Sequence, residues 1–144
     1  MLKTRVLKPT DEAHSTPLLI KSLLLSGRRY ESSQEIVYRD ISRYDYTTFN
    51  QRICQVANAL TKAGVKAGDT VAVMDWDSHR YLELMFAVPM LGAVMHTINI
   101  RLSPEQILYT MNHAEDIFVL VISEFVPIYK AIEGQLTSVE KTIL

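Results

Sequence analysis

Polar side chains that can bind ligands follow an apolar run in the segment VMHTINIRLSPEQILYTMNHAED, residues 94–116. His96, Asn99 and Arg101 lie where a predicted strand turns into a predicted helix. Ligands of open parallel sheets bind at the carboxyl ends of strands, and helix amino-terminal amides favour anions. Asn99 and Arg101 are therefore candidate residues for binding a cofactor or nucleotide. The alternative is structural: Asn99 satisfies the loop backbone, and Arg101 pairs with a carboxylate such as Glu105.

A second polar group follows the predicted strand at 70–74. Asp75 and Asp77 flank Trp76 and could form a carboxylate pair for acid–base chemistry, but capping of the next helix is the interpretation that we favour. Ser78 precedes His79, yet neighbours in sequence do not form a catalytic triad, and the strained G-x-S-x-G turn of a nucleophile elbow is absent from the sequence. We therefore assign no catalytic residue.

Phosphate loops and metal sites have no signature in this sequence. The five glycines include no pair that is adjacent or separated by one residue, so neither a dinucleotide-binding fingerprint nor a Walker loop can be drawn. The four histidines form no pair at i, i+4, and the single cysteine, Cys54, excludes a cysteine-based zinc cage. We expect no bound metal.

Composition and charge describe an ordinary globular chain. The 144 residues are 48% hydrophobic and 22% charged, with a net charge of −1, which argues against nucleic acid as a partner. Residues 1–30 hold six basic and two acidic side chains, a net charge of +4. The apolar run PLLIKSLLL is short and interrupted by Lys21, so it predicts neither a transmembrane segment nor a signal peptide. We expect a cytoplasmic protein.

Hydrophobic periodicity and turn signals predict the elements. Residues 1–16 show no period and form an arm, and a helix follows from Pro17, with Thr16 as its cap and Gly27 as its end. A β-hairpin is expected over 35–46. Further helices are expected at 47–63, 78–93, 104–114 and 125–136, and strands at 70–74, 94–100, 117–122 and 139–144.

Local signals place several helix ends. Asp45 or Thr48 can cap the helix at 47–63, and Gly64 suits the left-handed position after it. Pro89 predicts a kink or an early end in the helix at 78–93. Ser103, followed by proline and then Gln106, predicts a capping box.

The alternation of helices and strands predicts an α/β fold with a parallel sheet and helices on both faces, preceded by the arm, a helix and the β-hairpin. Residues 17–144 would form this subdomain. The last predicted strand reaches the last residue, so we expect a truncated piece of a larger amino-terminal domain.

Two long strings in this region resemble a known family. GVKAGDTVAVMDWDSHRYLELMFA and AVPMLGAVMHTINIRLSPEQILYTMNHAED are similar to the amino-terminal part of adenylate-forming acyl-CoA ligases, and most of all to medium- and long-chain fatty acyl-CoA synthetases. The resemblance implies a two-step enzyme: a fatty acid and ATP give an acyl-adenylate and pyrophosphate, and CoA then gives the thioester. Magnesium would neutralise phosphate oxygens in the first step.

The resemblance also limits what this chain can do. The phosphate loop, the adenine and ribose contacts and the carboxy-terminal domain of that family have no counterpart in these residues. We therefore expect the 144-residue chain to be inactive without the missing remainder, and to bind none of ATP, Mg²⁺ and CoA by itself. Asn99 and Arg101 would form part of the cleft wall near CoA or nucleotide. Relatives in the fatty-acid branch can pair through amino-terminal segments, which makes a homodimer through the arm an expected assembly. The alternatives are another adenylate-forming enzyme, such as an aryl acid–CoA ligase, and a non-catalytic dimerisation module.

Overall fold

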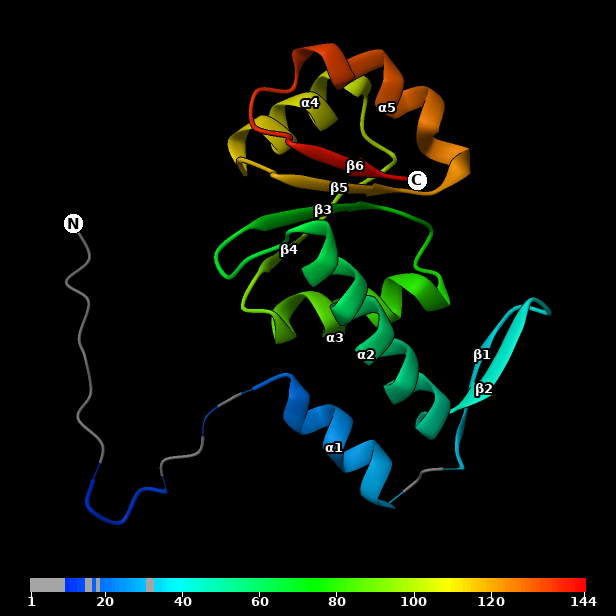
Figure 1. Ribbon diagram of the computed structural model, residues 1–144, viewed down its shortest axis with the longest axis vertical. Coiled ribbons are helices and arrows are strands. Elements are labelled where there is room, and N and C mark those ends of the chain that lie inside the picture. The colour runs from blue at the N-terminus through cyan, green and yellow to red at the C-terminus, as the bar shows by residue number, and fades with distance from the viewer. Residues whose placement is uncertain (1–9, 15–16, 18, 31–32) are drawn as a thin grey trace.

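The computed structural model describes residues 10–14, 17, 19–30 and 33–144. Its elements follow one another along the chain in the expected order (Figure 1). They are α1 (Lys21–Tyr30), β1 (Glu35–Tyr38), β2 (Ser42–Asp45), α2 (Tyr46–Ala63), β3 (Thr70–Met74), α3 (His79–Met90), β4 (Val94–Thr97), α4 (Pro104–His113), β5 (Phe118–Val121), η1 (Ser123–Phe125), α5 (Val126–Ile132), η2 (Glu133–Gln135) and β6 (Lys141–Ile143).

A four-stranded parallel sheet forms the centre of the molecule. Its strand order is β4-β3-β5-β6, and every neighbouring pair is parallel. Helices α2 and α3 cover one face, and α4 and α5 cover the other (Figure 1). The predicted α/β class and the layer arrangement are therefore confirmed.

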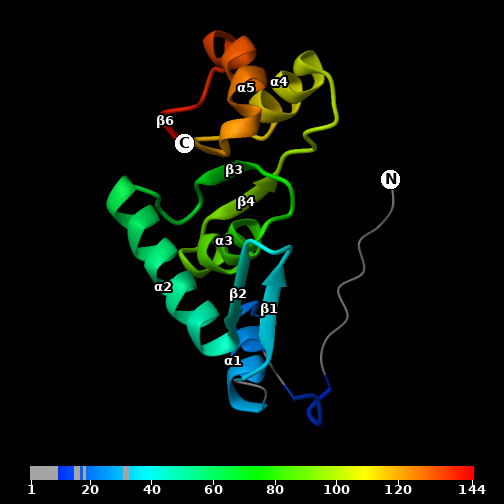
Figure 2. The same cartoon turned by 90° about the vertical axis from the view of Figure 1, so that its right-hand side faces the viewer.

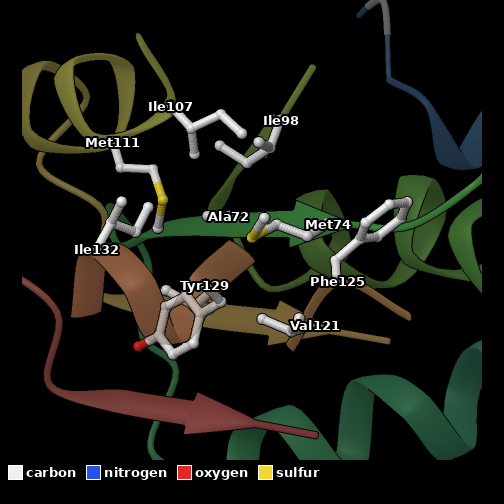
Figure 3. Packing of buried hydrophobic residues seen from close by; sticks show 10 residues of the cluster. Ala72, Met74, Ile98, Ile107, Met111, Val121, Phe125, Tyr129 and Ile132 are labelled. Carbon is white, nitrogen blue, oxygen red and sulfur yellow. The ribbon is translucent and has the colours of Figure 1, made fainter. Parts of the chain in front are cut away.

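The alternation of side chains along β3 builds the two halves of the core. Val71 and Val73 pack in a cluster with residues of α2 and α3, whereas Ala72 and Met74 pack with residues of α4 and α5. All four are at most 1% exposed. Figure 3 shows the second cluster, in which Tyr129 lies near the sheet. A strand buried on both faces reads as continuous apolar sequence, which is why TVAVM and FVLV carry no polar alternation.

Helix caps agree with the sequence signals at three ends. Asp45 caps α2 by accepting a hydrogen bond from the Thr48 amide at 2.7 Å, and Gly64 follows with φ 107°. Ser103 and Gln106 form the complete capping box of α4. Helix α3 ends at Met90, one residue after Pro89.

The prediction for the first helix was wrong at both ends. Helix α1 begins at Lys21 instead of Pro17, and Gly27 lies inside it. The proposed cap, Thr16, lies outside the described residues. A Cβ at Gly27 would lie 3.2 Å from ring atoms of Tyr46, so this glycine allows α1 to approach the start of α2 closely instead of ending the helix.

Several other elements are shorter than expected. Strand β4 ends at Thr97, and the residues up to 100 belong to the loop before α4. The helix expected at 125–136 is α5 followed by η2, with η1 directly before it, and the strand expected at 139–144 is limited to β6. Pro127 lies in the first turn of α5, where its missing amide hydrogen is tolerated.

The antiparallel hairpin β1–β2 packs beside α2 and α3 (Figure 2). A buried polar cluster fastens it there. Glu83 on α3 is 2% exposed and accepts hydrogen bonds from the Tyr44 hydroxyl at 2.8 Å and from Arg52 Nε at 2.6 Å. Burial, reinforced by the Glu83 carboxylate, raises the pKa of Tyr44 to about 12. One carboxylate thus joins three elements.

Candidate ligand cavity

The carboxyl ends of β3 and β4 open into a polar cavity of about 480 Å³. This volume lies within the range of small-molecule sites, roughly 300–1,000 Å³. The cavity is lined by residues of the two loops that follow these strands, by the last residue of β4 and by one residue of α3: Asp75, Trp76, Asp77, Tyr81, Thr97, Ile98, Asn99, Ile100 and Arg101. The structure therefore brings together the two polar groups that the sequence presents separately.

Asp75 is buried and has hydrogen-bond donors inside the loop. It is 6% exposed and accepts hydrogen bonds from the Ser78 hydroxyl at 2.5 Å and from the Trp76 amide at 2.6 Å. Ser78 in turn caps α3 by accepting from the amides of Arg80 and Tyr81. Our expectation that Asp75 and Asp77 cap this helix was therefore wrong. The cap is the serine, and Asp75 orients it.

Asp77 differs from Asp75 in exposure and backbone conformation. Its φ of 44° lies in the left-handed region, which costs free energy for a residue with a Cβ. Its side chain is exposed at the cavity. Asp75 is buried and accepts hydrogen bonds from its own loop, whereas Asp77 is exposed. The two carboxylates therefore do not form a pair suited to acid–base catalysis.

Asn99 and Arg101 lie on the β4 side of the cavity, and both are exposed. The Asn99 side chain accepts a hydrogen bond from the Arg101 amide at 3.1 Å, so it does support the loop backbone. Among the described residues, no carboxylate forms a salt bridge with Arg101. Glu105 is engaged within its own helix turn, where its backbone amide and the Ser103 hydroxyl lower its pKa. The guanidinium of Arg101 is thus available to an anion.

His96 belongs to the core side of β4 and not to the cavity. Its Nδ1 lies 2.9 Å and 3.0 Å from the two carboxylate oxygens of Asp116, whose side chain is fully buried. Asp116 precedes β5, the strand on the other side of β3. The pair fixes the loop before β5, which is a structural role.

The Ser78–His79 pair also has a structural explanation. Ser78 is used as the cap of α3, while the His79 ring lies 5.3 Å from the Tyr38 ring and 6.3 Å from the Tyr44 ring. Burial lowers the pKa of His79, so its neutral form is favoured. The imidazole therefore packs against the hairpin and does not activate the serine.

A second crevice lies between β3 and β5, where the strand order changes direction. Its volume is about 390 Å³, and its lining includes Val73, Leu120, Val121 and Ile143. Such switch points are common ligand sites in open α/β sheets. This crevice is largely apolar, and the polar side chains gather in the other cavity, which is the stronger candidate.

Sequence reasoning did not single out Trp76 as a residue of the cavity. Trp76 is 40% exposed, and its ring lies 4.9 Å from the Phe125 ring. The indole Nε1–H donates a hydrogen bond to the Glu124 carboxylate. Its position between two carboxylates directly after a strand was the available signal. Its partners in η1, Glu124 and Phe125, could not be inferred, because they lie 48 and 49 positions away.

The described residues offer neither a metal-binding cluster nor a membrane-spanning helix. Within residues 10–14, 17, 19–30 and 33–144, no group of three or more His, Cys, Asp or Glu side chains could hold a metal ion. None of the helices described for this chain is long and apolar enough to cross a membrane.

An open parallel sheet with a polar cavity at its strand ends is the architecture of a nucleotide- or cofactor-binding α/β domain. Residues 26–144 match the model of the AMP-binding enzyme family, so the chain belongs to this family. The resemblance to adenylate-forming acyl-CoA ligases is thereby confirmed.

Several curated relatives are acyl-CoA ligases. A long-chain-fatty-acid–CoA ligase of Thermus thermophilus is 36% identical over 138 residues, which are 93% of this chain and 25% of that protein. A 3-methylmercaptopropionyl-CoA ligase of Ruegeria lacuscaerulensis is 36% identical over 132 residues, 89% of this chain and 24% of that protein. The chain therefore spans about a quarter of the length of these relatives.

A solved structure supports the fold. The crystal structure of the anthranilate CoA ligase AuaEII in complex with anthranoyl-AMP matches with a TM-score of 0.78 at 24% identity. The match covers 84% of this chain and 23% of that one. It establishes that the α/β arrangement is shared.

Proposed function

We propose that this chain is the amino-terminal part of an AMP-forming fatty acid–CoA ligase. In the overall reaction, fatty acid, ATP and CoA give acyl-CoA, AMP and pyrophosphate. The observation that carries the proposal is the family match over 26–144, together with relatives whose names include fatty acid–CoA ligases. The polar cavity at the carboxyl ends of β3 and β4 supports a ligand-binding role for this region.

Within this function, Asn99 and Arg101 are proposed as cleft-wall residues near CoA or nucleotide. Both line the cavity, and the Arg101 guanidinium is exposed. An always-charged guanidinium with several donors is well suited to a phosphate group. Asn99 holds the loop that presents it. No residue of the chain is proposed as catalytic.

The residues of this chain do not provide for the triphosphate of ATP or for magnesium. The sequence has no glycine-rich phosphate loop, and the described residues hold no metal-binding cluster. We propose that these groups are held by further sequence in a protein of the relatives' length. The 144-residue chain should then release no pyrophosphate when given ATP and fatty acid. Release by the purified chain, above that of a heat-denatured sample, would overturn this proposal.

The acid substrate is proposed to be a fatty acid of medium or long chain. Relatives with this name and a relative that is a 3-methylmercaptopropionyl-CoA ligase have similar identities, so the relatives by themselves support more than one acid class. The experiment is acyl-CoA formation by an enzyme of full relative length with a panel of acids. The panel includes fatty acids of graded length, 3-methylmercaptopropionate and an aryl acid. Preference for either of the last two would overturn the fatty-acid assignment.

Assembly and location complete the proposal. We propose a homodimer formed through residues 1–16, of which 1–9, 15 and 16 lie outside the described residues, and a cytoplasmic location. Light scattering of the chain with and without residues 1–16 tests the assembly. A mass that does not change on deletion would contradict a dimer formed by the arm.

A further inference from the structure

We propose that His79 is a pH-sensitive contact between the β1–β2 hairpin and helix α3. It holds the hairpin in place while its ring is neutral, and it releases the hairpin when the ring is protonated. Such a conformational change goes beyond the proposed ligase reaction, because it involves no substrate and no bound ligand.

The hairpin depends on side-chain contacts for its position. Among the described strands, β1 and β2 pair with each other and form a sheet separate from the central one. A two-stranded hairpin is marginally stable by itself in water. Its place beside α2 and α3 (Figure 2) is therefore fixed by the side chains between them. An element held in this way can open locally at a lower free energy than the central sheet.

The His79 ring packs against both strands of the hairpin. His79 is the first residue of α3, and its ring centroid lies 5.3 Å from that of Tyr38 in β1 and 6.3 Å from that of Tyr44 in β2. The same residue lines a crevice of about 420 Å³ together with Ile36 of the hairpin and Met85 of α3. One half-buried imidazole thus joins three elements.

The buried ring nitrogen of His79 suits the neutral form alone. Among the described residues, its Nδ1 is a buried atom without a hydrogen-bond partner. A neutral imidazole can leave one nitrogen without a proton, whereas a protonated ring carries N–H on both. Protonation therefore places a charged donor at a buried position with no acceptor, which is costly. The position in the first turn of α3 adds to the cost, since the helix dipole disfavours a cation there.

Charged and titratable groups surround His79 on every element packed against it. They are Tyr38, Arg39 and Tyr44 of the hairpin, Arg52 of α2, Arg80, Tyr81 and Glu83 of α3, and Asp75 and Asp77 of the loop after β3. Burial has the largest effect and lowers the pKa of His79 below its ordinary 6.5; Glu83 opposes this effect, and Arg80 adds to it. Glu83 is itself paired with Arg52.

The lowered pKa sets the direction of the pH response. Below pH 6.5 the ring of a released hairpin takes up a proton more readily than the ring of the docked one. The contribution of His79 to docking is therefore complete above pH 6.5 and is lost as the pH falls below it. The crevice shares Asp77, Tyr81 and Thr97 with the polar cavity, so release of the hairpin changes a wall that belongs to both.

Hydrogen exchange of the 144-residue chain tests the release. Exchange is followed by mass spectrometry between about pH 7.5 and 5, where histidine titrates, and is corrected for the pH dependence of unstructured amides. We expect the protection of residues 35–45 to fall several-fold below pH 6.5, by at most about tenfold per pH unit, the limit for one proton. The protection of β3 and β5 should stay unchanged. Constant protection of the hairpin, or an equal fall in β3 and β5, would overturn the proposal.

Variants identify the titrating group. His79→Phe keeps an aromatic ring between the two strands and removes the titration, so its hairpin should keep its protection over the whole range. His113→Phe is the matched control, because His113 is exposed and stacks on Tyr109 of α4; it should respond as the wild type does. A fall in His79→Phe as large as in the wild type would overturn the proposal and assign the response to a carboxylate such as Glu83. If His79→Phe does not fold, His79→Gln, whose amide does not titrate, takes its place.

A proton NMR titration follows the charge of the ring directly. The imidazole signal that is absent from His79→Phe belongs to His79. We expect its titration midpoint to lie below that of N-acetylhistidine amide, and hairpin protection to fall over the same pH range. A midpoint at or above that of the model compound would overturn the proposal.

Discussion

The polar groups around Glu83 and those around Arg101 differ in how completely the protein itself satisfies them. Glu83 is buried and accepts hydrogen bonds from both Tyr44 and Arg52. Arg101 is exposed, and no salt bridge to it occurs among the described residues. Both groups lie near the start of α3. The group around Glu83 lies beside the hairpin, and the group around Arg101 lies at the cavity.

This difference distinguishes polar residues that have a structural role from polar residues that can bind a ligand. A buried charge without partners is costly, so a fold that buries one must also supply its donors. An exposed guanidinium has no such requirement and remains available to a ligand. Substitution near Glu83 should therefore affect stability, and substitution near Arg101 should affect binding.

The largest expected loss of stability follows Glu83→Ala. The change leaves Arg52 and the Tyr44 hydroxyl without their acceptor beneath the hairpin. A hydrogen bond to a charged group contributes about 1.5–3 kcal/mol, and Arg52, which is 38% exposed, can be hydrated after the change, so we expect a loss of about 3 kcal/mol of unfolding free energy for the two bonds together. Denaturant unfolding measures the loss. Glu133→Ala, which breaks the exposed pair with Lys130, is the matched control and should cause no resolvable change. Equal effects of the two substitutions would contradict the comparison.

Alkaline pH should weaken the same cluster. The pKa of Tyr44 is raised from 10.0 to about 12 in the folded protein. A raised pKa means that the unfolded chain loses this proton first, so the contribution is complete below about pH 10 and is lost as pH rises towards 12. Melting temperatures of wild type and Tyr44→Phe across this range measure the effect. Their difference should shrink as pH rises, and a constant difference would contradict it.

A smaller loss of stability is expected at the start of α4. Ser103→Ala removes the acceptor for the Gln106 amide and breaks the capping box. Loss of such a cap costs about 0.5–2 kcal/mol. Ser103→Thr retains the hydroxyl and is the conservative control. Chemical denaturation of the three chains gives the comparison, and wild-type stability of the alanine variant would show that the cap is dispensable.

The smallest effect on stability is expected for Arg101→Ala. Because no described carboxylate depends on this guanidinium, the melting temperature should stay nearly unchanged. In an enzyme of full relative length, KM for CoA or ATP should rise instead. Kinetics and thermal melting of this one variant give both readouts. A lowered melting temperature with unchanged KM would assign Arg101 to the structural group with Glu83.

Much of the fold could be predicted because its signals are local. The caps at Asp45 and Ser103 and the turn at Gly64 each depend on residues within a few positions. Gly27 shows the limit of local signals. It resembles a helix stop in sequence, yet its role is to admit the ring of Tyr46 from another helix.

The candidate site was predicted only in part. Asn99 and Arg101 follow a strand in sequence, and the structure places both at the cavity, although ligand binding by them stays a prediction. Trp76 was not singled out, because its importance depends on Glu124 and Phe125 from a distant element. Residue types show which groups can bind, and packing shows which of them are fixed and exposed together.

The sequence by itself determined the order of the elements, their hydrophobic faces and the family to which the chain belongs, because periodicity, caps and motifs are properties of neighbouring residues. Only the tertiary structure decided that β3 is central, that β5 inserts beside it, and that the loops after β3 and β4 share one cavity. The contacts of Glu83 with Arg52 and Tyr44 span 31 and 39 positions, and that of His96 with Asp116 spans 20. Such contacts depend on the free energy of the whole packed core, which no local pattern specifies.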